Sequence, residues 1–302
     1  MNKTEMTGLD RGCPACRSRN SLPGGQKAEF DILNCRDCGS IFTSSIPTLA
    51  HAQDYDDYYS AANLTVPEFT HKRLDEIVAG FEKYRGANRL LEVGFGAGSF
   101  LQAAARGGWN VEGVEISKTA CDHSSAAGFK TFCGELSEAH YPDADFDVVI
   151  ASELLEHVPE PSSIIREVAR IVRPGGLFWA TTPNAKGLSS RLLGLEWSVL
   201  SPPEHLHLFS ASGLKGLLLE CGFRRVEINT EGVNPFELMK KLRRPEPIDQ
   251  AVSTNGNDRV SSGYRLNEAM ATSGTRKTIK NSINSLLRVS RLGDSLKIWA
   301  ER

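Results

Sequence analysis

The chain has 302 residues, of which 40% are hydrophobic and 24% charged, and its formal net charge at pH 7 is -2. This composition is typical of a globular protein with one large domain and room for a small second one. The small net charge gives no general attraction to nucleic acid or to acidic membranes. Because no apolar run reaches transmembrane length and the polar N-terminus lacks a signal-peptide core, we expect a cytoplasmic protein.

Four of the seven cysteines form two C-x-x-C pairs within residues 11–45. Cys13 and Cys16 make the first pair, and Cys35 and Cys38 follow after eighteen intervening residues. This spacing predicts a four-cysteine zinc site built on two tight turns, in a small zinc-ribbon-like module. So short a segment with few apolar residues could hardly fold without a metal. A redox dithiol is the main alternative.

Residues 46–68 are interpreted as a connector. They contain an aromatic, acidic run at 54–59, which either folds over a bound cofactor or forms a solvated loop. An amphipathic helix is predicted next from apolar residues that recur at helical spacing. These residues are Leu74, Ile77, Val78, Phe81 and Tyr84.

From residue 89 onward, strand patterns alternate with helical patterns, which predicts a mostly parallel sheet covered by helices on both faces. The expected strands lie near 89–93, 111–116, 130–133, 146–152, 176–182 and 223–230. One helix should begin at Pro161 and another after Ser210, which is a suitable N-cap. Residues 233–292 are interpreted as an insertion, flexible over 245–275, before a closing strand pattern.

The most informative motif is a glycine-rich turn directly after the first of these strands. Glu92 precedes three alternating glycines, Gly94, Gly96 and Gly98, and a second acid, Glu115, closes the next strand about twenty residues later. Glycines allow a ligand to approach the backbone, and an acid at the second strand end can accept both ribose hydroxyls. A carboxylate beside the turn would repel a pyrophosphate but suits a cationic amino group.

On these motifs the chain resembles the class I S-adenosylmethionine (SAM) methyltransferases, and the runs 146–153, 155–158 and 172–176 continue the resemblance. The resemblance implies a doubly wound, seven-stranded, mostly parallel Rossmann-like sheet. It also implies a SAM-binding domain over residues 69–232. The last strand, in 293–302, would be inserted antiparallel beside the sixth.

The resemblance also assigns the SAM contacts. The glycines would approach the methionine and ribose parts, Glu92 would orient the amino group, and Glu115 would hold the ribose. Residues after the third strand would meet the adenine. A serine is added because it lies at the carboxyl end of the fourth strand, where such sheets bind ligands. The expected contacts are Glu92, Gly94, Gly96, Gly98, Glu115, Glu135, Leu136 and Ser152.

Two constellations are candidates for the methyl-acceptor side. Glu153, Glu156 and His157 resemble the E-x-x-E-H run of ubiquinone-type O-methyltransferases, for which a divalent metal has been proposed. Glu153 is also a candidate catalytic residue. The alternative is that the three residues have a structural role or contact SAM.

The second constellation is the run from Pro202 to Ser210, in which two histidines fall on the same face of an extended segment. His205 is the first candidate for a general base, because the ordinary pKa of histidine is near neutrality. His207 is the weaker candidate. The alternative is that the histidines only position the loop.

An apolar segment, 188–200, follows the fifth strand and could cap the acceptor pocket. It could equally touch a membrane surface, as a similarly placed segment does in ubiquinone-pathway relatives. Two basic amphipathic stretches, 236–244 and 277–291, would support peripheral attachment at the inner membrane surface. The alternative is that these are solvated helices packed on the domain.

A zinc module joined to such a domain resembles the sugar and small-molecule methyltransferases of bacterial surface-glycan and antibiotic pathways. This chain lacks the long C-terminal domain of their C-methylating members. We therefore expect O-methylation of a small-molecule partner, namely a sugar or a glycan- or lipid-linked intermediate.

Two alternatives differ in class. A ribosomal RNA base methyltransferase would use the zinc module to grip RNA, although residues 11–45 carry mixed charges and few aromatic side chains. A catalytically inactive protein would use the zinc module to bind a partner, although the glycine turn and both of its acids are intact.

Overall fold

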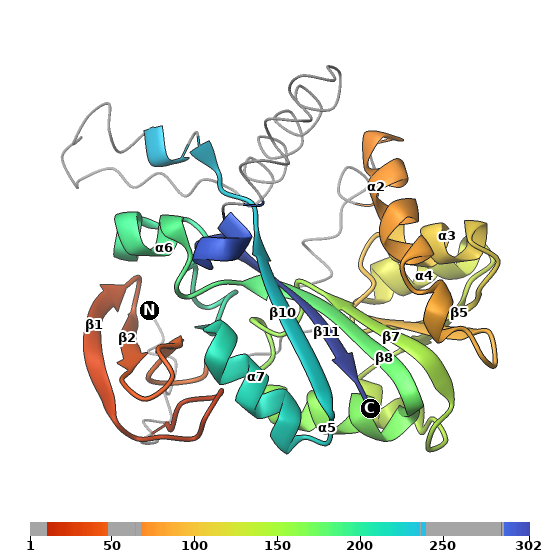
Figure 1. Cartoon of the computed structure of the whole chain (residues 1–302), viewed down its shortest axis with the longest axis horizontal. Helices are drawn as coiled ribbons and strands as arrows, with labels where there is room; N and C mark the ends of the chain where they lie inside the picture. Colours follow the sequence, from red (N-terminus) through yellow and green to blue (C-terminus); the bar gives the residue numbers. More distant parts are fainter. Residues whose placement is uncertain (1–10, 48–63, 65–67, 236, 240–284, 286) are drawn as a thin grey trace.

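The computed structural model describes residues 11–47, 64, 68–235, 237–239, 285 and 287–302 (Figure 1). Several predicted features lie outside these residues. They are the acidic aromatic run at 54–59, the polar stretch 245–275 and most of the two amphipathic stretches.

The large sheet has seven strands in the order β10-β11-β8-β7-β4-β5-β6. The five strands β4 to β8 pair in parallel, whereas β11 is antiparallel to both of its neighbours. The predicted doubly wound, mostly parallel sheet is therefore confirmed. The strands are β4 (Arg89–Val93), β5 (Asn110–Glu115), β6 (Lys130–Cys133), β7 (Phe146–Ser152), β8 (Val172–Pro183), β10 (Arg225–Glu231) and β11 (Ser295–Glu301).

Helices cover both faces of this sheet. Side chains alternate between the two faces along each strand, and both faces carry apolar residues that the helices bury. On β7, Val148 and Ile150 pack in one apolar cluster with α2 and α3, and Val149 and Ala151 pack in another with α5 and α7. The helices are α2 (Glu68–Ala79), α3 (Ser99–Arg106), α4 (Lys118–Ala126), α5 (Pro161–Ile171), α6 (Leu188–Leu193) and α7 (Ala211–Glu220). Short 3-10 turns lie at η1 (Glu82–Tyr84), η2 (Leu136–Ala139) and η3 (Gly194–Glu196).

The N-terminal module has its own antiparallel sheet, in the order β1-β2-β3-β9. The first three strands are β1 (Ser21–Lys27), β2 (Phe30–Cys35) and β3 (Ile41–Thr43), and the fourth, β9 (His207–Leu208), comes from the large domain. In the register, Ile41 pairs with Leu208 and Phe42 with His207. The boundary predicted at residue 45 therefore separates two strands of one sheet. In Figure 1 the module lies beside α6 and α7, opposite α2, α3 and α4.

The apolar segment 188–200 packs against this module. Lys27 Nζ donates a hydrogen bond to the carbonyl oxygen of Trp197, 2.7 Å away. A shared apolar cluster joins the segment to the module strands: Phe30, Ile32, Ala185, Leu193, Trp197, Leu200 and Leu208. The segment thus buries its apolar side chains on the module, a role that the sequence did not indicate. No helix within the described ranges is long and apolar enough to cross a membrane.

This packing yields a prediction about stability. Trp197 is 2% exposed, so Trp197→Ala should open a cavity between module and domain and lower the free energy of unfolding by about 3–5 kcal/mol. Urea unfolding followed by near-ultraviolet circular dichroism measures the loss. Leu192→Ala is the matched control, because Leu192 lies on the same segment but is 55% exposed. The control should change the value by less than about 0.5 kcal/mol, and similar losses in both variants would contradict the assigned packing.

Candidate functional site

The glycine turn joins β4 to α3 at the carboxyl edge of the sheet. Gly94, Gly96 and Gly98 have φ of 68°, 50° and 68°, in the left-handed region that glycine adopts without strain. A Cβ on Gly94 would also lie 2.9 Å from a methyl carbon of Leu154. The turn therefore requires glycine both for its backbone conformation and for the space beside it.

Glu115, at the end of β5, is 6% exposed and reaches back to this turn. Its Oε2 accepts a hydrogen bond from the backbone N–H of Gly96 at 2.9 Å. Its Oε1 accepts from the N–H groups of Ile116 and Ser117, at 2.8 and 3.1 Å. The carboxylate is thus held at the mouth of the glycine turn, where the sequence placed a ribose-binding acid.

Glu92 is 3% exposed and lies behind the turn. Its Oε2 accepts a hydrogen bond from the N–H of Leu101, in the first turn of α3, at 3.0 Å. Burial raises the pKa of Glu92 well above its usual value, and the negative charge of Glu115 adds to this rise. The carboxylate therefore fastens α3 to β4, a structural task that the sequence did not indicate, and its contact with an amino group stays a prediction.

The other expected SAM contacts lie at the carboxyl ends of neighbouring strands. Glu135 follows β6, is exposed, and caps η2, while Leu136 is 3% exposed in the core. Ser152 ends β7, and its hydroxyl lies 3.0 Å from Thr181 Oγ1 on β8. The fold thus places the predicted contacts along one edge of the sheet, which is where open α/β sheets bind ligands.

The turns between β7 and α5, residues 153–160, carry the acidic part of the acceptor side. Glu153 has a φ of 50°, and its N–H donates to the Thr181 carbonyl at 2.9 Å. Glu156 is fully buried, and its Oε2 accepts from Thr182 Oγ1 at 2.9 Å. Its Oε1 has no hydrogen-bond partner among the described residues. Burial, followed by the charge of Glu153, raises the pKa of Glu156 well above its usual value.

Two histidines meet beside this carboxylate, with ring centroids 4.6 Å apart. The Nδ1 of His157 lies 2.9 Å from the Glu204 carbonyl oxygen. The Nδ1 of His205 contacts the carbonyl oxygen of Val199. Because a carbonyl only accepts, we assign the proton of each ring to Nδ1, which leaves a lone pair on each Nε2. One ligand atom each from Glu156, His157 and His205 lie within 4.8 Å of one another.

This grouping corrects the predicted metal set, because His205 stands with Glu156 and His157 where Glu153 was expected. Sequence reasoning missed the grouping because Glu204, which His157 contacts, lies 47 positions further along the chain. Sequence patterns over a few neighbouring residues do not predict a contact between residues so far apart.

The prediction that His207 could act as a general base is wrong. It is fully buried in β9, and its Nε2 lies 2.8 Å from the Leu155 carbonyl oxygen. Its Nδ1 lies 3.3 Å from Nη2 of Arg11. Burial, followed by the charge of Arg11, lowers the pKa of His207 to about 3. The ring therefore stays neutral and out of reach of a substrate.

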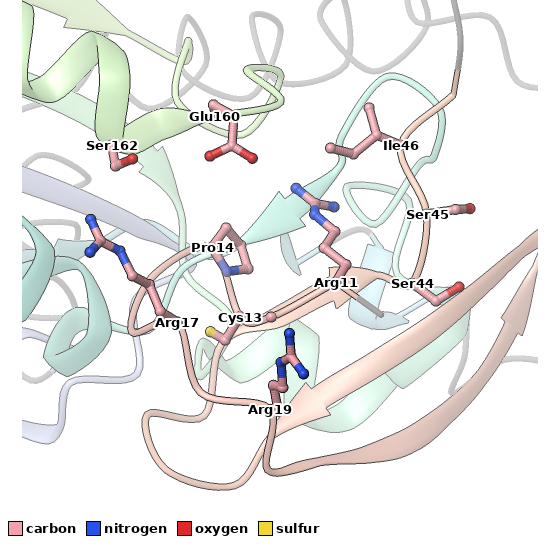
Figure 2. Close-up of a pocket in the computed structure, with 11 residues that line it drawn as sticks. Arg11, Cys13, Pro14, Arg17, Arg19, Ser44, Ser45, Ile46, Glu160 and Ser162 are labelled. Carbon is pink, nitrogen blue, oxygen red and sulfur yellow. The ribbon is translucent and has the colours of Figure 1, made fainter. Parts of the chain in front are cut away.

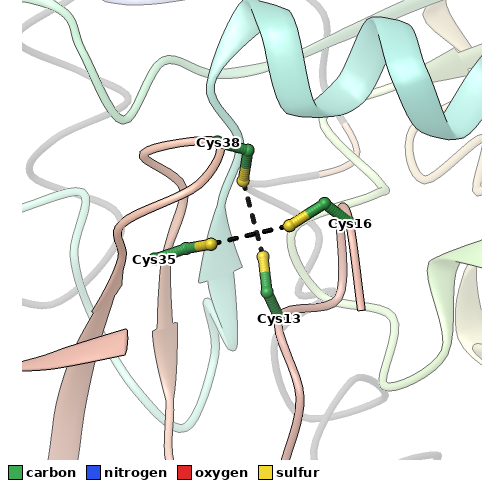
Figure 3. A group of neighbouring side chains, drawn as sticks. All are labelled: Cys13, Cys16, Cys35 and Cys38. Atoms are coloured by element: carbon green, nitrogen blue, oxygen red, sulfur yellow. Dashed lines mark hydrogen bonds between the residues drawn. The ribbon is translucent and has the colours of Figure 1, made fainter. Parts of the chain in front are cut away.

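The four predicted metal ligands of the module point at one centre (Figure 3). The Sγ atoms of Cys13 and Cys38 are 3.6 Å apart, and those of Cys16 and Cys35 are 3.5 Å apart. Four sulfurs about 2.3 Å from a zinc ion would be separated by roughly 3.8 Å, so the cluster fits a tetrahedral zinc site. Both short contacts join one C-x-x-C turn to the other, an arrangement unlike that of a dithiol formed within one motif.

The start of α7 lies against this cluster. Ser210, the N-cap, donates from Oγ to the Cys38 carbonyl oxygen at 2.7 Å and accepts from the N–H of Gly213 at 3.0 Å. A Cβ on Gly213 would lie 3.0 Å from the Cys38 sulfur. The positive end of the helix dipole thus faces the thiolate cluster, which favours negative charge on the sulfurs.

The family described as "Methyltransferase domain" matches residues 66–228, more than half of the chain. The chain belongs to this methyltransferase family. The crystal structure of a SAM dependent methyltransferase from Archaeoglobus fulgidus has a similar fold, with a TM-score of 0.50 and 20% identity, over 77% of this chain and 94% of that one.

Two relatives of this methyltransferase are ubiquinone biosynthesis O-methyltransferases. The protein from Ralstonia nicotianae is 30% identical over 56% of this chain and 77% of its own length. The protein from Thiobacillus denitrificans is 28% identical over 55% of this chain and 77% of its own length. Family, relatives and fold agree that the chain is a SAM-dependent methyltransferase.

The buried histidines make the stability of this methyltransferase depend on pH. The pKa values of His157 and His207 are lowered to about 3 by burial, so the unfolded chain binds more protons at any pH between 3 and about 6.5. The stability that these two histidines contribute is therefore complete above pH 6.5 and falls below it, by up to about 1.4 kcal/mol per pH unit for each group.

Urea unfolding at pH 7.5, 6.5 and 5.5 tests this pH dependence. The measured quantity is the slope of the free energy of unfolding against pH. His207→Gln removes one titrating group and should flatten the slope below pH 6.5 by about 1.4 kcal/mol per unit. His123→Gln, at an exposed position of α4, is the control and should keep the wild-type slope. Equal slopes in all three proteins would show that His207 is not buried as a neutral ring.

Proposed function

We propose that this methyltransferase moves the methyl group of SAM to a hydroxyl oxygen of a small molecule. The observation that carries the proposal is the convergence of Glu156, His157 and His205, within 4.8 Å, beyond the carboxyl edge of the sheet that holds the glycine turn. The names of the O-methyltransferase relatives support the same reaction. The acceptor predicted from the sequence is a sugar or a glycan- or lipid-linked intermediate, and a phenol is the acceptor type to compare with it.

Methyl transfer is an in-line displacement, so the protein mainly aligns the two partners and excludes water. The new bond joins the acceptor oxygen to the methyl carbon, the carbon–sulfur bond breaks, and S-adenosylhomocysteine leaves. We assign Gly94, Gly96 and Gly98 to the backbone contacts with SAM, Glu115 to the ribose and Glu92 to the amino end. The backbone N–H groups that hold Glu115 keep its carboxylate in place for the ribose hydroxyls.

The hydroxyl proton needs an acceptor, and His205 is the proposed base. Its Nδ1 is held by the Val199 carbonyl, which leaves Nε2 free of a proton. His157 has the same tautomer through Glu204 and lies against the His205 ring. Both rings are partly buried, and His205 comes from the turn before β9, separate from the one that carries His157, so we propose that His205 meets an acceptor entering above the sheet.

The same three side chains fit a divalent cation. The Oε1 atom of Glu156 is buried without a hydrogen-bond partner in the described part of the chain, and one ligand atom each of Glu156, His157 and His205 lie within 4.8 Å of one another. Two histidines and one carboxylate are a common ligand set for divalent metals. As the alternative to a base at His205, whose one lone pair cannot both bind a metal and accept a proton, we propose that Glu156, His157 and His205 hold such a cation, which would lower the pKa of a bound hydroxyl.

The function is tested first at the cofactor. Isothermal titration of the full-length protein with SAM and with S-adenosylhomocysteine should give micromolar dissociation constants. Glu115→Ala should weaken SAM binding by at least tenfold, which corresponds to about 1.4 kcal/mol, because it removes the carboxylate assigned to the ribose. Asp122→Asn is the control, since Asp122 is exposed on α4 and pairs with Lys118, and it should bind SAM like the wild type.

Acceptors are then compared by transfer of a labelled methyl group to nucleotide sugars, quinol-like phenols and ribosomal RNA. Labelled sugar or phenol supports the proposal and identifies the acceptor class. Label in RNA alone would replace it with RNA methylation. A folded protein that binds no SAM would overturn the enzyme assignment and favour a protein that uses its cysteine module to bind a partner.

The metal is tested with Mn²⁺ as the probe, by calorimetry on protein desalted at pH 7.5. His205→Ala and Glu156→Gln should each weaken Mn²⁺ binding by at least tenfold, whereas His123→Ala, at an exposed position, should not. If the wild type binds no Mn²⁺ and transfers methyl groups equally well with and without added Mg²⁺, the metal is excluded. Loss of transfer in His205→Ala would then assign His205 as a base acting alone.

A further inference from the structure

The turns that carry Glu156 and His157 are held by hydrogen bonds from distant parts of the chain. Three of their backbone carbonyls accept hydrogen bonds from other parts of the chain. The Leu155 oxygen lies 2.8 Å from His207 Nε2, the Glu156 oxygen accepts from the Leu206 N–H at 2.9 Å, and the Pro159 oxygen accepts from Arg11 at 3.2 Å. The shape of these turns therefore depends on β9 and on the N-terminal module.

Arg11 makes most of this connection. Its Nη1 donates to the carbonyl and the hydroxyl oxygens of Thr43, at 3.2 and 3.0 Å, inside the module. Its Nη2 reaches Pro159 and His207 in the large domain. Figure 2 shows this side chain extending from the module towards the segment that carries Glu160, at a cavity of about 430 Å³. Only a guanidinium has enough donors in one plane to serve all of these acceptors.

His207 links Arg11 to the turn that carries Glu156 and His157. A guanidinium only donates, so the Nδ1 of His207 must accept from Arg11 and its proton must lie on Nε2. That proton is then donated to the Leu155 carbonyl. On the backbone, the Thr43 N–H donates to Leu206 at 3.0 Å, and the Leu206 N–H donates to Glu156. Side chains and backbone thus form two parallel links from β3 to the turn that carries His157.

The module end of these links is close to the cysteine cluster. Arg11 lies two positions before Cys13, and Thr43 lies five positions after Cys38. Cys38 is itself fastened to the start of α7 by Ser210 and Ser212, whose hydroxyls donate to its carbonyl at 2.7 and 3.2 Å. The two turns that carry the four sulfurs therefore lie close along the chain to both Arg11 and Thr43.

We propose that Arg11 and His207 are positioning residues, through which the cysteine module holds Glu156, His157 and His205 in register for the methyl acceptor. The inference deepens the proposed function by making the module part of the acceptor site. The module then acts on the large domain by orienting the turn at 153–160, while the SAM turn at 92–98 is held by its own local contacts.

The test uses the full-length protein and no methyl acceptor, so it succeeds or fails independently of the proposed function. Arg11→Met removes the donors and keeps a long side chain. Arg17→Met is the matched control, because Arg17 lines the same cavity but pairs with Glu220 at 2.9 Å. Hydrogen exchange is measured by mass spectrometry, and histidine ¹⁵N spectra report the ring tautomers.

In Arg11→Met, peptides covering 152–160 and 201–208 should exchange about tenfold faster, and the signals of His157, His205 and His207 should shift. Peptides covering 89–101 and the SAM dissociation constant should stay within twofold of the wild type. Arg17→Met should match the wild type in every measurement. Faster exchange confined to residues 11–47, or histidine signals identical to those of the control, would overturn the proposal.

A second variant covers the possibility that Arg11→Met unfolds. Arg11→Lys keeps the charge but has a single nitrogen, so it cannot serve Thr43, Pro159 and His207 together. The histidine signals should shift as in Arg11→Met, with a smaller increase in exchange. A lysine variant with wild-type spectra would show that charge alone suffices and that the directed hydrogen bonds of Arg11 do not position the turn.

Discussion

The pairing of β3 with β9 is the constraint on which the acceptor side of this methyltransferase depends. It makes one sheet from two parts of the chain that are far apart in sequence, with Phe42 opposite His207. Once these backbones are paired, His207 must lie in the interior, and an interior imidazole needs partners on both ring nitrogens. Arg11 and the Leu155 carbonyl are those partners. One strand pairing thereby orders the module, β9 and the turn at 153–160 together.

The cofactor side is organised differently, because its contacts are local. Glu92 holds the start of α3, and Glu115 holds the glycine turn, each through backbone N–H groups within about twenty residues. Two buried carboxylates so close to each other are costly, and the rise in the pKa of Glu92 reflects that cost. The N–H groups offset it by supplying fixed positive dipoles. These contacts hold the glycine turn and its acids in place without help from distant parts of the chain.

Local patterns were enough to predict the elements that frame the site. The strands β4, β6 and β7 and the starts of α5 and α7 lie where the apolar periodicity, Pro161 and Ser210 predict them. The glycine turn with its acids and the cysteine spacing could be found in the same way, because each depends on neighbours a few residues apart. That β9, from far along the chain, joins the sheet of the module could not be predicted in this way.

The sequence by itself determined the α/β sheet, the glycine turn and the four clustered cysteines, because strand and helix periodicity and short spacings are properties of contiguous residues. Only the tertiary structure decided what the polar and apolar residues of the later loops do. It placed His207, a candidate base, in the core, brought His205 to Glu156 and His157, and packed segment 188–200 on the module. The physical reason is that burial and hydrogen-bond partners are set by whichever distant segment packs alongside, and no local pattern records that neighbour.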